Sequence, residues 1–392
     1  MKNYNDIEIY VNDNGNESIK SMDENFNKVH FLNVATEVTD IEANNHEEIE
    51  LRLDKERKSV YSCLDVTIYR NDVNLGRYYI GNIAIDYFSS KAGRRNASVR
   101  KAKDKQTYIC SYTATALKIL EQESTEDYIN KGNIIFGACL PMGEFLKQSL
   151  YEEMVNGFTG HFKIEFNRGI LKGKVVEFLI DKDDVFVFPE SSIGLRGLYY
   201  NDDGTYNNSF VEEVGDRYLI SIDIGSISTD MGGLRNEKPV PQLCNHIGEG
   251  IRQPLTRVKS VVEQYIENEY KREVDISIDE LNVVVLDFEC KYPFGRSQLD
   301  IKEVVNVELK RSVKNILNDI DDKIDINMNN KVYGIYTFGG GSILMKDFIN
   351  KRLSNRFPLI NMENALWVNS KSSVKVLKNE KLTRIKSTMF EE

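Results

Sequence analysis

The sequence lacks long hydrophobic runs, paired cysteines and closely spaced histidines. No apolar stretch approaches the ~18 residues that a membrane-spanning helix needs. The N-terminal stretch MKNYNDIEIYVNDNG is polar and lacks the apolar segment that a signal peptide requires. The five cysteines form no CxxC pair, and the four histidines have no zinc-site spacing. We therefore expect a reduced, cytoplasmic protein with no membrane contact.

Positive charge is also in short supply. Lysine and arginine number 51 against 61 aspartates and glutamates, so the net charge is −10. An acidic surface argues against broad contact with nucleic-acid phosphates, and no direct nucleic-acid partner is expected. The one strongly basic stretch, GRRNASVRKAKDK (93–105), is interpreted as a solvated surface loop. Contact with a neighbouring, acidic subunit is the alternative interpretation.

The common nucleotide-binding signatures are absent as well. There is no GxxxxGK[ST] loop and no GxGxxG turn. The 392 residues exceed the length at which one core stops growing, so two domains or more are expected.

The hydrophobic pattern alternates strands with helices along the chain. We predict strands at 62–70, 76–88 and 133–140, and helices at 111–124, 143–157 (stopped by Gly157), 254–273 and 300–320. Residues 332–353 predict a strand, a triple glycine and a helix. This mixture indicates an α/β protein.

One strand ends in an unusual way, at YLISIDIGSISTD (218–230). The apolar run reaches Asp223, turns at Gly225 and closes on a second acid, Asp230. A simple β-hairpin explains the glycine. A phosphate-binding hairpin explains the acids too, because backbone N–H groups can bind an anion while a carboxylate at the strand end faces a metal ion.

The same plan occurs near the N-terminus, in DNGNESIK (13–20). The two motifs are offset by 210 positions, from Asp13 to Asp223, and a lysine, Lys20, stands where the second motif has Asp230. Two such hairpins predict a duplicated architecture that holds a polyphosphate. Asp13 and Asp223 would hold Mg²⁺ through its water molecules, since Mg²⁺ dehydrates reluctantly, and Lys20 would reach a phosphate as a point charge.

A third glycine-rich element is FGGGSILM (338–345). Its glycines allow close approach of the backbone to a flat ring or a sugar, and the helix that follows offers its N-terminus. A flexible turn is the simpler interpretation of this element alone. Glu249, in HIGEGIRQ, is a candidate for bonding ribose hydroxyls.

These three motifs, in this order, resemble those of the actin, sugar-kinase and heat-shock-chaperone ATPases. Within that superfamily the chain is most similar to bacterial plasmid-segregation actins of the ParM type. FGACLPMGEF (136–145) and FPES (188–191) fit the resemblance too, which implies that Glu190 orients the attacking water. Asn14, Asn16 and Glu17 depart from the usual residues of the first motif. Together, motifs and resemblance give catalytic Glu190 and Asp223, and nucleotide-binding Asp13, Asn14, Gly15, Asn16, Lys20, Gly225, Ser226, Ser228, Glu249, Gly339, Gly340, Gly341 and Ser342.

The resemblance implies an actin-like two-domain ATPase fold, with a mixed sheet flanked by helices in each domain and a nucleotide cleft between them. Domain I is expected at 1–188, with its core at 1–35 and 106–188 and an inserted subdomain at 36–105. Domain II is expected at 189–365, with a subdomain at 246–320, and the segment 366–392 is expected to pack back on domain I.

The implied function is a filament-forming ATPase that uses ATP (or GTP) and Mg²⁺ and acts in plasmid segregation. Its partners would be further copies of itself and a DNA-binding adaptor protein. A small-molecule kinase of the same fold is one alternative, although FPESSIGLRG carries no sugar-kinase signature. A membrane-associated cell-shape or division actin is the other, although the C-terminal stretch has no clear apolar face.

Overall fold

The computed structural model of the chain describes residues 2–44, 60–88, 99–123, 125–321, 323–324 and 331–390. The chain forms two compact units, each with its own sheet and its own hydrophobic core. Unit 1 contains Met1–Asn208 and Asn369–Glu392, and unit 2 contains Ser209–Val368. The divisions thus fall after residues 208 and 368, whereas the sequence placed them after 188 and 365.

Unit 1 is built on a ten-stranded mixed sheet in the order β3-β2-β1-β7-β9-β8-β5-β6-β4, with β10 beside β7. Its strands are β1 (Glu8–Asn14), β2 (Ser18–Asp23), β3 (Lys28–Leu32), β4 (Ala35–Val38), β5 (Leu64–Arg70), β6 (Val73–Ile80), β7 (Tyr128–Leu140), β8 (Gly160–Phe166), β9 (Val175–Ile180) and β10 (Val185–Pro189). The three neighbours β1, β7 and β10 are parallel. Their carboxyl ends therefore meet at one edge of the sheet.

The longest strand, β7, pairs with different strands along its two halves. Its first half pairs with β9 and its second half with β1 and β10. The register shifts between Asn130 and Asn133, where Gly132 takes a φ of +70°, a conformation that glycine adopts without strain. This irregularity lets one strand join the two parts of the sheet.

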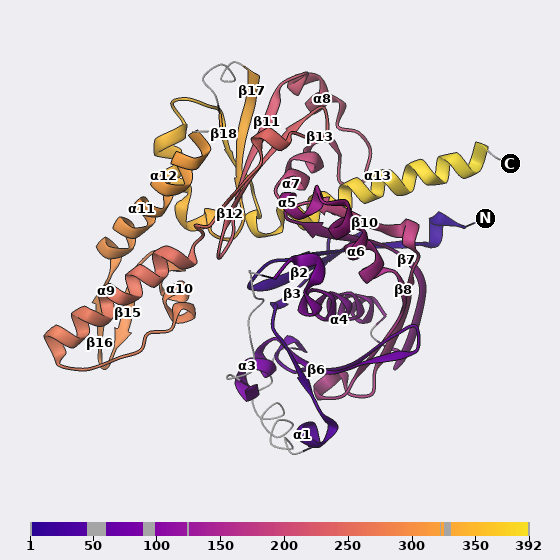
Figure 1. The fold of residues 1–392 in the computed structure, drawn as a ribbon, viewed down its shortest axis with the longest axis horizontal. Coiled ribbons are helices and arrows are strands. Elements are labelled where there is room, and N and C mark those ends of the chain that lie inside the picture. Colours follow the sequence, from indigo (N-terminus) through magenta and orange to yellow (C-terminus); the bar gives the residue numbers. More distant parts are fainter. Residues whose placement is uncertain are drawn as a thin grey trace. The chain divides into compact units, whose positions relative to one another are not determined.

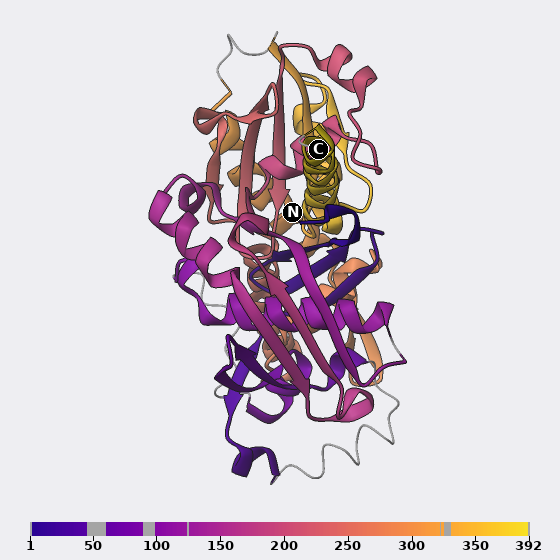
Figure 2. The same cartoon turned by 90° about the vertical axis from the view of Figure 1, so that its right-hand side faces the viewer.

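Helix α4 (Lys105–Gln122) is the central helix of unit 1. It contacts β1, β2 and β3 as well as β8 and β9, and Figure 1 shows it on the inner side of the curved sheet. In Figure 2 the magenta strands of the sheet cross over this helix. Nearly every residue from Thr107 to Leu120 is buried, as expected for a helix covered on several sides. The helix predicted at 111–124 is thereby confirmed, with an earlier start.

The remaining helices of unit 1 are short, apart from the last. They are α1 (Asp40–Asn44), α3 (Asn82–Phe88), α5 (Met142–Phe145), α6 (Gln148–Phe158), α7 (Ser192–Arg196) and α13 (Val368–Phe390), with 3₁₀ turns that include η3 (Lys101–Lys103). Of α13, residues from Asn369 onward belong to unit 1. Helix α13 packs closely against Gly197. A side chain at this position would clash with the helix, because a Cβ there would lie 2.2 Å from Ser372 Oγ.

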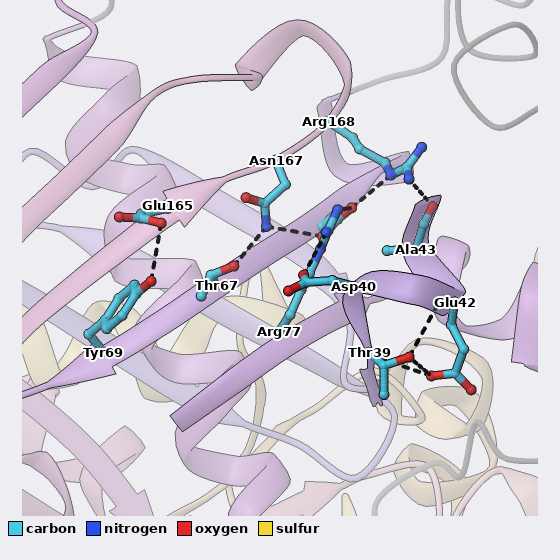
Figure 3. A network of polar contacts seen from close by, with 11 residues as sticks. Thr39, Asp40, Glu42, Ala43, Thr67, Tyr69, Arg77, Glu165, Asn167 and Arg168 are labelled. Atoms are coloured by element: carbon cyan, nitrogen blue, oxygen red, sulfur yellow. Dashed lines mark hydrogen bonds and ion pairs between the residues drawn. The ribbon is translucent and has the colours of Figure 1, made fainter. Parts of the chain in front are cut away.

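A polar network joins β5 and β6 to the turn after β8 (Figure 3). Arg77 and Arg168 both bind the buried carboxylate of Asp65, with N–O distances of 2.7–2.8 Å. Arg77 also reaches the exposed Asp40 at 3.1 Å, and Arg168 donates to the carbonyl of Ala43. Beside the network lies a polar cavity of about 540 Å³. Two arginines on one buried carboxylate tie three separate segments of the sheet together.

Two sequence-based predictions in unit 1 are wrong in part. The apolar run 76–88, predicted as one strand, is strand only to Ile80 and continues as helix α3 after Gly81, whose φ is +71°. A short apolar run does not by itself distinguish the two structures. Gly157 does not stop α6, which runs on to Phe158. It is needed for packing instead, since a Cβ there would lie 2.2 Å from the ring of Tyr108.

Unit 2 has a six-stranded sheet in the order β13-β12-β11-β17-β18, with β14 beside β12. Its strands are β11 (Tyr218–Ile224), β12 (Thr229–Arg235), β13 (Lys238–Pro239), β14 (Asn245–Ile247), β17 (Val332–Phe338) and β18 (Leu359–Asn361), and a separate hairpin is formed by β15 (Lys291–Phe294) and β16 (Ser297–Asp300). Strands β11 and β17 are parallel, and β11 and β12 form an antiparallel hairpin. The arrangement repeats that of β7, β1 and β2 in unit 1.

The helices of unit 2 are α8 (Asn208–Val214), α9 (Arg252–Tyr270), α10 (Ile278–Leu286), α11 (Lys302–Asp321) and α12 (Ser342–Leu353). Helix α9 packs on α10 and α11, and Figure 1 shows these three grouped with the β15–β16 hairpin away from the sheet. The helices predicted at 254–273 and 300–320 are confirmed as α9 and α11, and their apolar stripes form part of the core of unit 2.

Candidate functional site

The two Asp-x-Gly motifs form hairpins of the same geometry. In the first, the N–H of Gly15 donates to the carbonyl of Ser18 at 2.9 Å; in the second, the N–H of Gly225 donates to that of Ser228 at 2.8 Å. These pairs are related by the same offset of 210 positions that relates Asp13 to Asp223. Both glycine N–H groups close their turns, so these glycines shape the hairpins rather than offering that N–H to a ligand.

The residues across each hairpin differ in charge. Lys20 lies opposite Asp13 in the first, and their side chains form an ion pair of 2.6 Å. Burial alone would raise the pKa of the Asp13 carboxyl, but the charges of Lys20 and Lys101 hold it below its ordinary value. In the second hairpin Asp230 lies opposite Asp223 and bonds the ring of His246 at 2.8 Å. One hairpin therefore presents an anion with a cation, and the other two acids.

Asn14, predicted to contact the nucleotide, points its side chain into the protein. Its amide nitrogen donates to the carbonyl of Thr107 at 3.0 Å and to Ser111 Oγ at 2.5 Å, both on α4. This side chain anchors the first hairpin to the central helix. The position explains why an amide stands here; the side-chain oxygen of Asn14 is buried and has no hydrogen-bond partner among the described residues.

The glycine run after β17 packs against the second hairpin. A Cβ on Gly339 would lie 2.3 Å from Asp223 Oδ1, and one on Gly341 would lie 2.5 Å from Ile224 Cγ2. The N–H of Gly341 also donates to the carbonyl of Ile224 at 2.9 Å. Gly340 is different, because a Cβ there would lie 3.6 Å from its nearest neighbour, Leu366 Cδ1, which is an ordinary contact distance. The structure thus brings the second and third motifs together, and two of the three glycines are needed for that contact alone.

One polar atom of the second hairpin fits an additional ligand. The hydroxyl of Ser226 is buried and has no hydrogen-bond partner among the described residues. A buried hydroxyl of this kind is costly unless a partner arrives. Gly250 contacts the same residue, since a Cβ there would lie 2.5 Å from the carbonyl of Ser226. The surroundings of Ser226 are compatible with a bound phosphate oxygen that accepts from its hydroxyl.

Glu249, the candidate for ribose contact, is held by two helices. Arg257 of α9 lies 2.9 Å from its carboxylate, and Ser312 of α11 donates to the same oxygen. Arg257 also pairs with Glu308 of α11 at 2.5 Å. A ribose hydroxyl would have to share Glu249 with these partners.

Glu190 follows β10, at the edge where the parallel strands of unit 1 end. Its N–H donates to the carbonyl of Leu140, the last residue of β7, at 2.7 Å. Ligands of α/β proteins characteristically bind outside the carboxyl ends of parallel strands. Its carboxylate receives a hydrogen bond from Lys101, a residue that sequence reasoning missed.

The missed residue corrects the interpretation of the basic stretch 93–105. Residues 93–98 lie outside the described part of the chain, and Arg100, Lys103 and Lys105 are exposed as expected. Lys101, however, is only 1 % exposed. Nothing in the local sequence distinguishes it from its basic neighbours, so only the fold identifies it.

No cluster of three or more His, Cys, Asp or Glu side chains able to hold a metal ion occurs in the described ranges. A Mg²⁺ ion held mainly by water and phosphate oxygens would not require such a cluster. Within the same described ranges, no helix is long and apolar enough to cross a membrane.

Comparisons with known proteins identify the family. Residues 12–192 match the model described as "Actin like proteins N terminal domain", and residues 221–351 match "Archaeal actin homologue MreB-like, C-terminal". No curated protein sequence matches the chain. The chain belongs to the actin-like ATPase superfamily. Solved structures of ParM proteins share its fold at 14–16 % identity.

Solved structures confirm the fold class, α/β with a mixed sheet and flanking helices in each of two domains. Actin-like protein Alp7A is similar with a TM-score of 0.73 and 17 % identity, covering 98 % of both chains. A 15-stranded ParM filament from Clostridium botulinum gives 0.66 and 16 %, covering 95 % of this chain and 99 % of the other. Bacillus thuringiensis ParM with AMPPNP gives 0.64 and 15 %, with 97 % and 99 % covered.

Proposed function

We propose that the chain is a nucleotide-driven, filament-forming ATPase whose hairpins bind phosphate groups of ATP. The observation that carries this proposal is the repeated hairpin, Gly15 to Ser18 and Gly225 to Ser228, each at the end of a strand that carries an aspartate. Actin-like proteins are generally ATPases. The nucleotide analogue bound to the Bacillus thuringiensis protein and the filament formed by the Clostridium botulinum protein support the two halves of the proposal.

The residues have separate roles in this proposal. Lys20 binds a phosphate oxygen, and Ser226 donates its hydroxyl to another. Asp13 and Asp223 hold water ligands of Mg²⁺, which when bound would neutralise charge on the phosphates. Glu190 accepts a hydrogen bond from a water molecule and aligns it with the γ-phosphorus, because phosphoryl transfer depends mainly on positioning and charge stabilisation.

Filament growth follows from head-to-tail contact between identical subunits, which gives an open helix when the rotation does not close. Loss of the γ-phosphate would then weaken subunit contacts through a shift in conformational population. We extend the proposal to plasmid segregation, with a DNA-binding adaptor protein at the filament. Its test is the loss frequency of the replicon that carries the gene, which should rise when Glu190→Ala replaces the wild type.

The biochemical test combines two readouts in one tube. Light scattering and released phosphate are followed after ATP and Mg²⁺ are added, for the wild type and for Glu190→Ala. The wild type should scatter and then release phosphate, whereas the variant should assemble and scarcely hydrolyse. Glu153→Ala, a change of an exposed glutamate on α6, is the matched control and should behave as the wild type. EDTA should abolish both signals.

Two results would reject this function. If nucleotide binds and scattering stays flat, the chain is no filament former, and a small-molecule kinase becomes the better assignment. If neither ATP nor GTP binds at concentrations of about 1 mM, the assignment of both hairpins is wrong.

A further inference from the structure

Lys101 is a buried lysine that belongs to none of the nucleotide motifs. Its side chain is 2 % exposed, and its ammonium pairs with the carboxylate of Glu190, which is 17 % exposed. Taking a lysine out of water is costly unless the charge is paired. The two residues are 89 positions apart in the sequence, so the fold brings them together.

The turn that carries Lys101 is held from two sides. The N–H groups of Lys101 and Ala102 donate to the two carboxylate oxygens of Glu144, at 3.0 and 3.2 Å. Glu144 lies on α5, directly after the end of β7, and is itself buried. On the other side, the hydroxyl of Tyr108 donates to the carbonyl of Ala102. The backbone at Lys101 is therefore fixed relative to the strand ends.

The backbone of Glu190 is fixed as well. Its N–H is bound by Leu140, and its carbonyl accepts from Ser191 Oγ at 2.5 Å and from the N–H of Ser192 at 2.7 Å. Ser191 has a φ of +61°, an uncommon conformation for a residue other than glycine that tends to occur at functional sites. With both backbones fixed, the remaining freedom of Glu190 lies in its side chain, and the ion pair with Lys101 restricts that.

Lys101 also acts on the first hairpin. Its charge, after that of Lys20, opposes the effect of burial and lowers the pKa of the Asp13 carboxyl. Asp13, Lys101 and Glu190 all influence the buried thiol of Cys139 on β7, whose pKa is raised by burial first. The ammonium of Lys101 therefore pairs with the residue proposed to orient water, and its charge also acts on the carboxyl of the first hairpin.

We propose that Lys101 is a positioning residue for hydrolysis, which holds the Glu190 carboxylate in the direction from which it aligns the attacking water. The inference rests on the ATPase function proposed above. Lys101 makes no bond to the substrate in this scheme, and it acts only through Glu190. A buried ion pair that merely maintains the fold is the competing explanation.

Four variants separate these explanations: Lys101→Met, Lys101→Arg, Glu190→Gln and the double variant Lys101→Met/Glu190→Gln. Single-turnover phosphate release and the affinity for ATP and ADP are measured for each. Lys101→Met should slow hydrolysis about 10- to 100-fold, a range typical of a displaced catalytic group, and change the affinity for either nucleotide by less than about threefold. Lys101→Arg, which keeps the charge, should restore part of the rate.

The double variant provides the sharpest comparison. If Lys101 acts through Glu190, adding Lys101→Met to Glu190→Gln should slow hydrolysis no further. The double variant also removes both charges of the pair, so it leaves no unpaired charge and should fold even if Lys101→Met does not. Lys101→Arg supplies a second folded variant.

Each contrary result overturns the inference in its own way. A Lys101→Met variant with a lower melting temperature and an unchanged rate means that the pair is structural. Weaker binding of ATP relative to ADP with an unchanged rate means that Lys101 binds the γ-phosphate instead. Multiplying effects in the double variant mean that Lys101 and Glu190 act independently.

A failure of the ATPase proposal is distinguishable from these results, because the wild type would then release no phosphate. Crystal structures of the wild type and of Lys101→Met supply a readout that does not depend on turnover. Glu190 should keep its side-chain direction in the first and lose it in the second; an unmoved carboxylate in Lys101→Met would refute the positioning role.

Discussion

Lys20 and Asp13 face each other across the first hairpin and form an ion pair of 2.6 Å. The equivalent pair in the second hairpin is Asp223 with Asp230, two acids. The first hairpin therefore places a lysine opposite its aspartate, whereas the second places an aspartate there. The positive charge of Lys20 would balance the negative charge of a bound polyphosphate. Removing Lys20 should therefore lower the affinity for ATP.

We expect Lys20→Met to weaken ATP binding by about 10- to 100-fold, the range for loss of one charge-assisted hydrogen bond. A fluorescent ATP analogue measures the affinity, and Lys103→Met, at an exposed lysine of the same unit, is the matched control. Lys20→Arg should retain most of the affinity. Equal affinities of the Lys20→Met variant and the control would remove Lys20 from the site.

Asp65→Asn should destabilise the protein strongly, by about 3–5 kcal/mol, because it leaves Arg77 and Arg168 without their shared buried anion. Asp40→Asn is the matched control, because Asp40 also pairs with Arg77 but its side chain is 84 % exposed. This variant should lower the free energy of unfolding by less than about 1 kcal/mol. Urea unfolding followed by circular dichroism measures both. Similar losses in the two variants would contradict the role given to burial.

Gly339→Ala should destabilise unit 2 by about 1–3 kcal/mol. Its Cβ would lie 2.3 Å from Asp223 Oδ1, and its φ of +85° is unfavourable for alanine. Gly340→Ala, with 3.6 Å to its nearest neighbour, should be tolerated. The single tryptophan, Trp367, reports the unfolding of unit 2 by fluorescence. If the two alanine variants melt together, the close packing of the glycine run is wrong.

The contact between Asp202 and the C-terminal helix α13 should stabilise the protein less at low pH. Burial would raise the pKa of Asp202, but hydrogen bonds from Lys371 and Lys375 of α13 lower it below its ordinary value of 3.8. A lowered pKa in the folded state stabilises the protein above the unfolded value, and this contribution disappears as the pH falls below about 3.8. Because Asp202 is 58 % exposed, the effect should be under about 1 kcal/mol.

Comparing the wild type with Asp202→Asn tests this pH dependence. Their urea midpoints should differ at pH 6, and the difference should narrow as the pH falls below 3.8 and through the lowered folded-state pKa of Asp202. A difference that persists unchanged at pH 3 would mean that the charge of Asp202 does not support α13.

Local patterns were sufficient wherever a feature depends on neighbouring residues. Tight turns need particular residues at fixed positions, so the hairpins at Asp13 and Asp223 and their common offset could be predicted. Apolar periodicity likewise predicted α9 and α11. The stretch 76–88 shows the limit of such patterns, because its run of apolar residues is compatible with strand or helix and only the surrounding sheet decides.

By itself, the sequence determined the order of the three motifs, the twin hairpins and, through them, the actin-like family. The tertiary structure alone decided what each polar side chain contacts: Asn14 points into α4, Gly339 packs on Asp223, and Lys101 lies buried against Glu190. The physical reason is distance along the chain. A hairpin closes over a few residues, whereas an ion pair between residues 89 positions apart exists only after strands and helices have assembled around it.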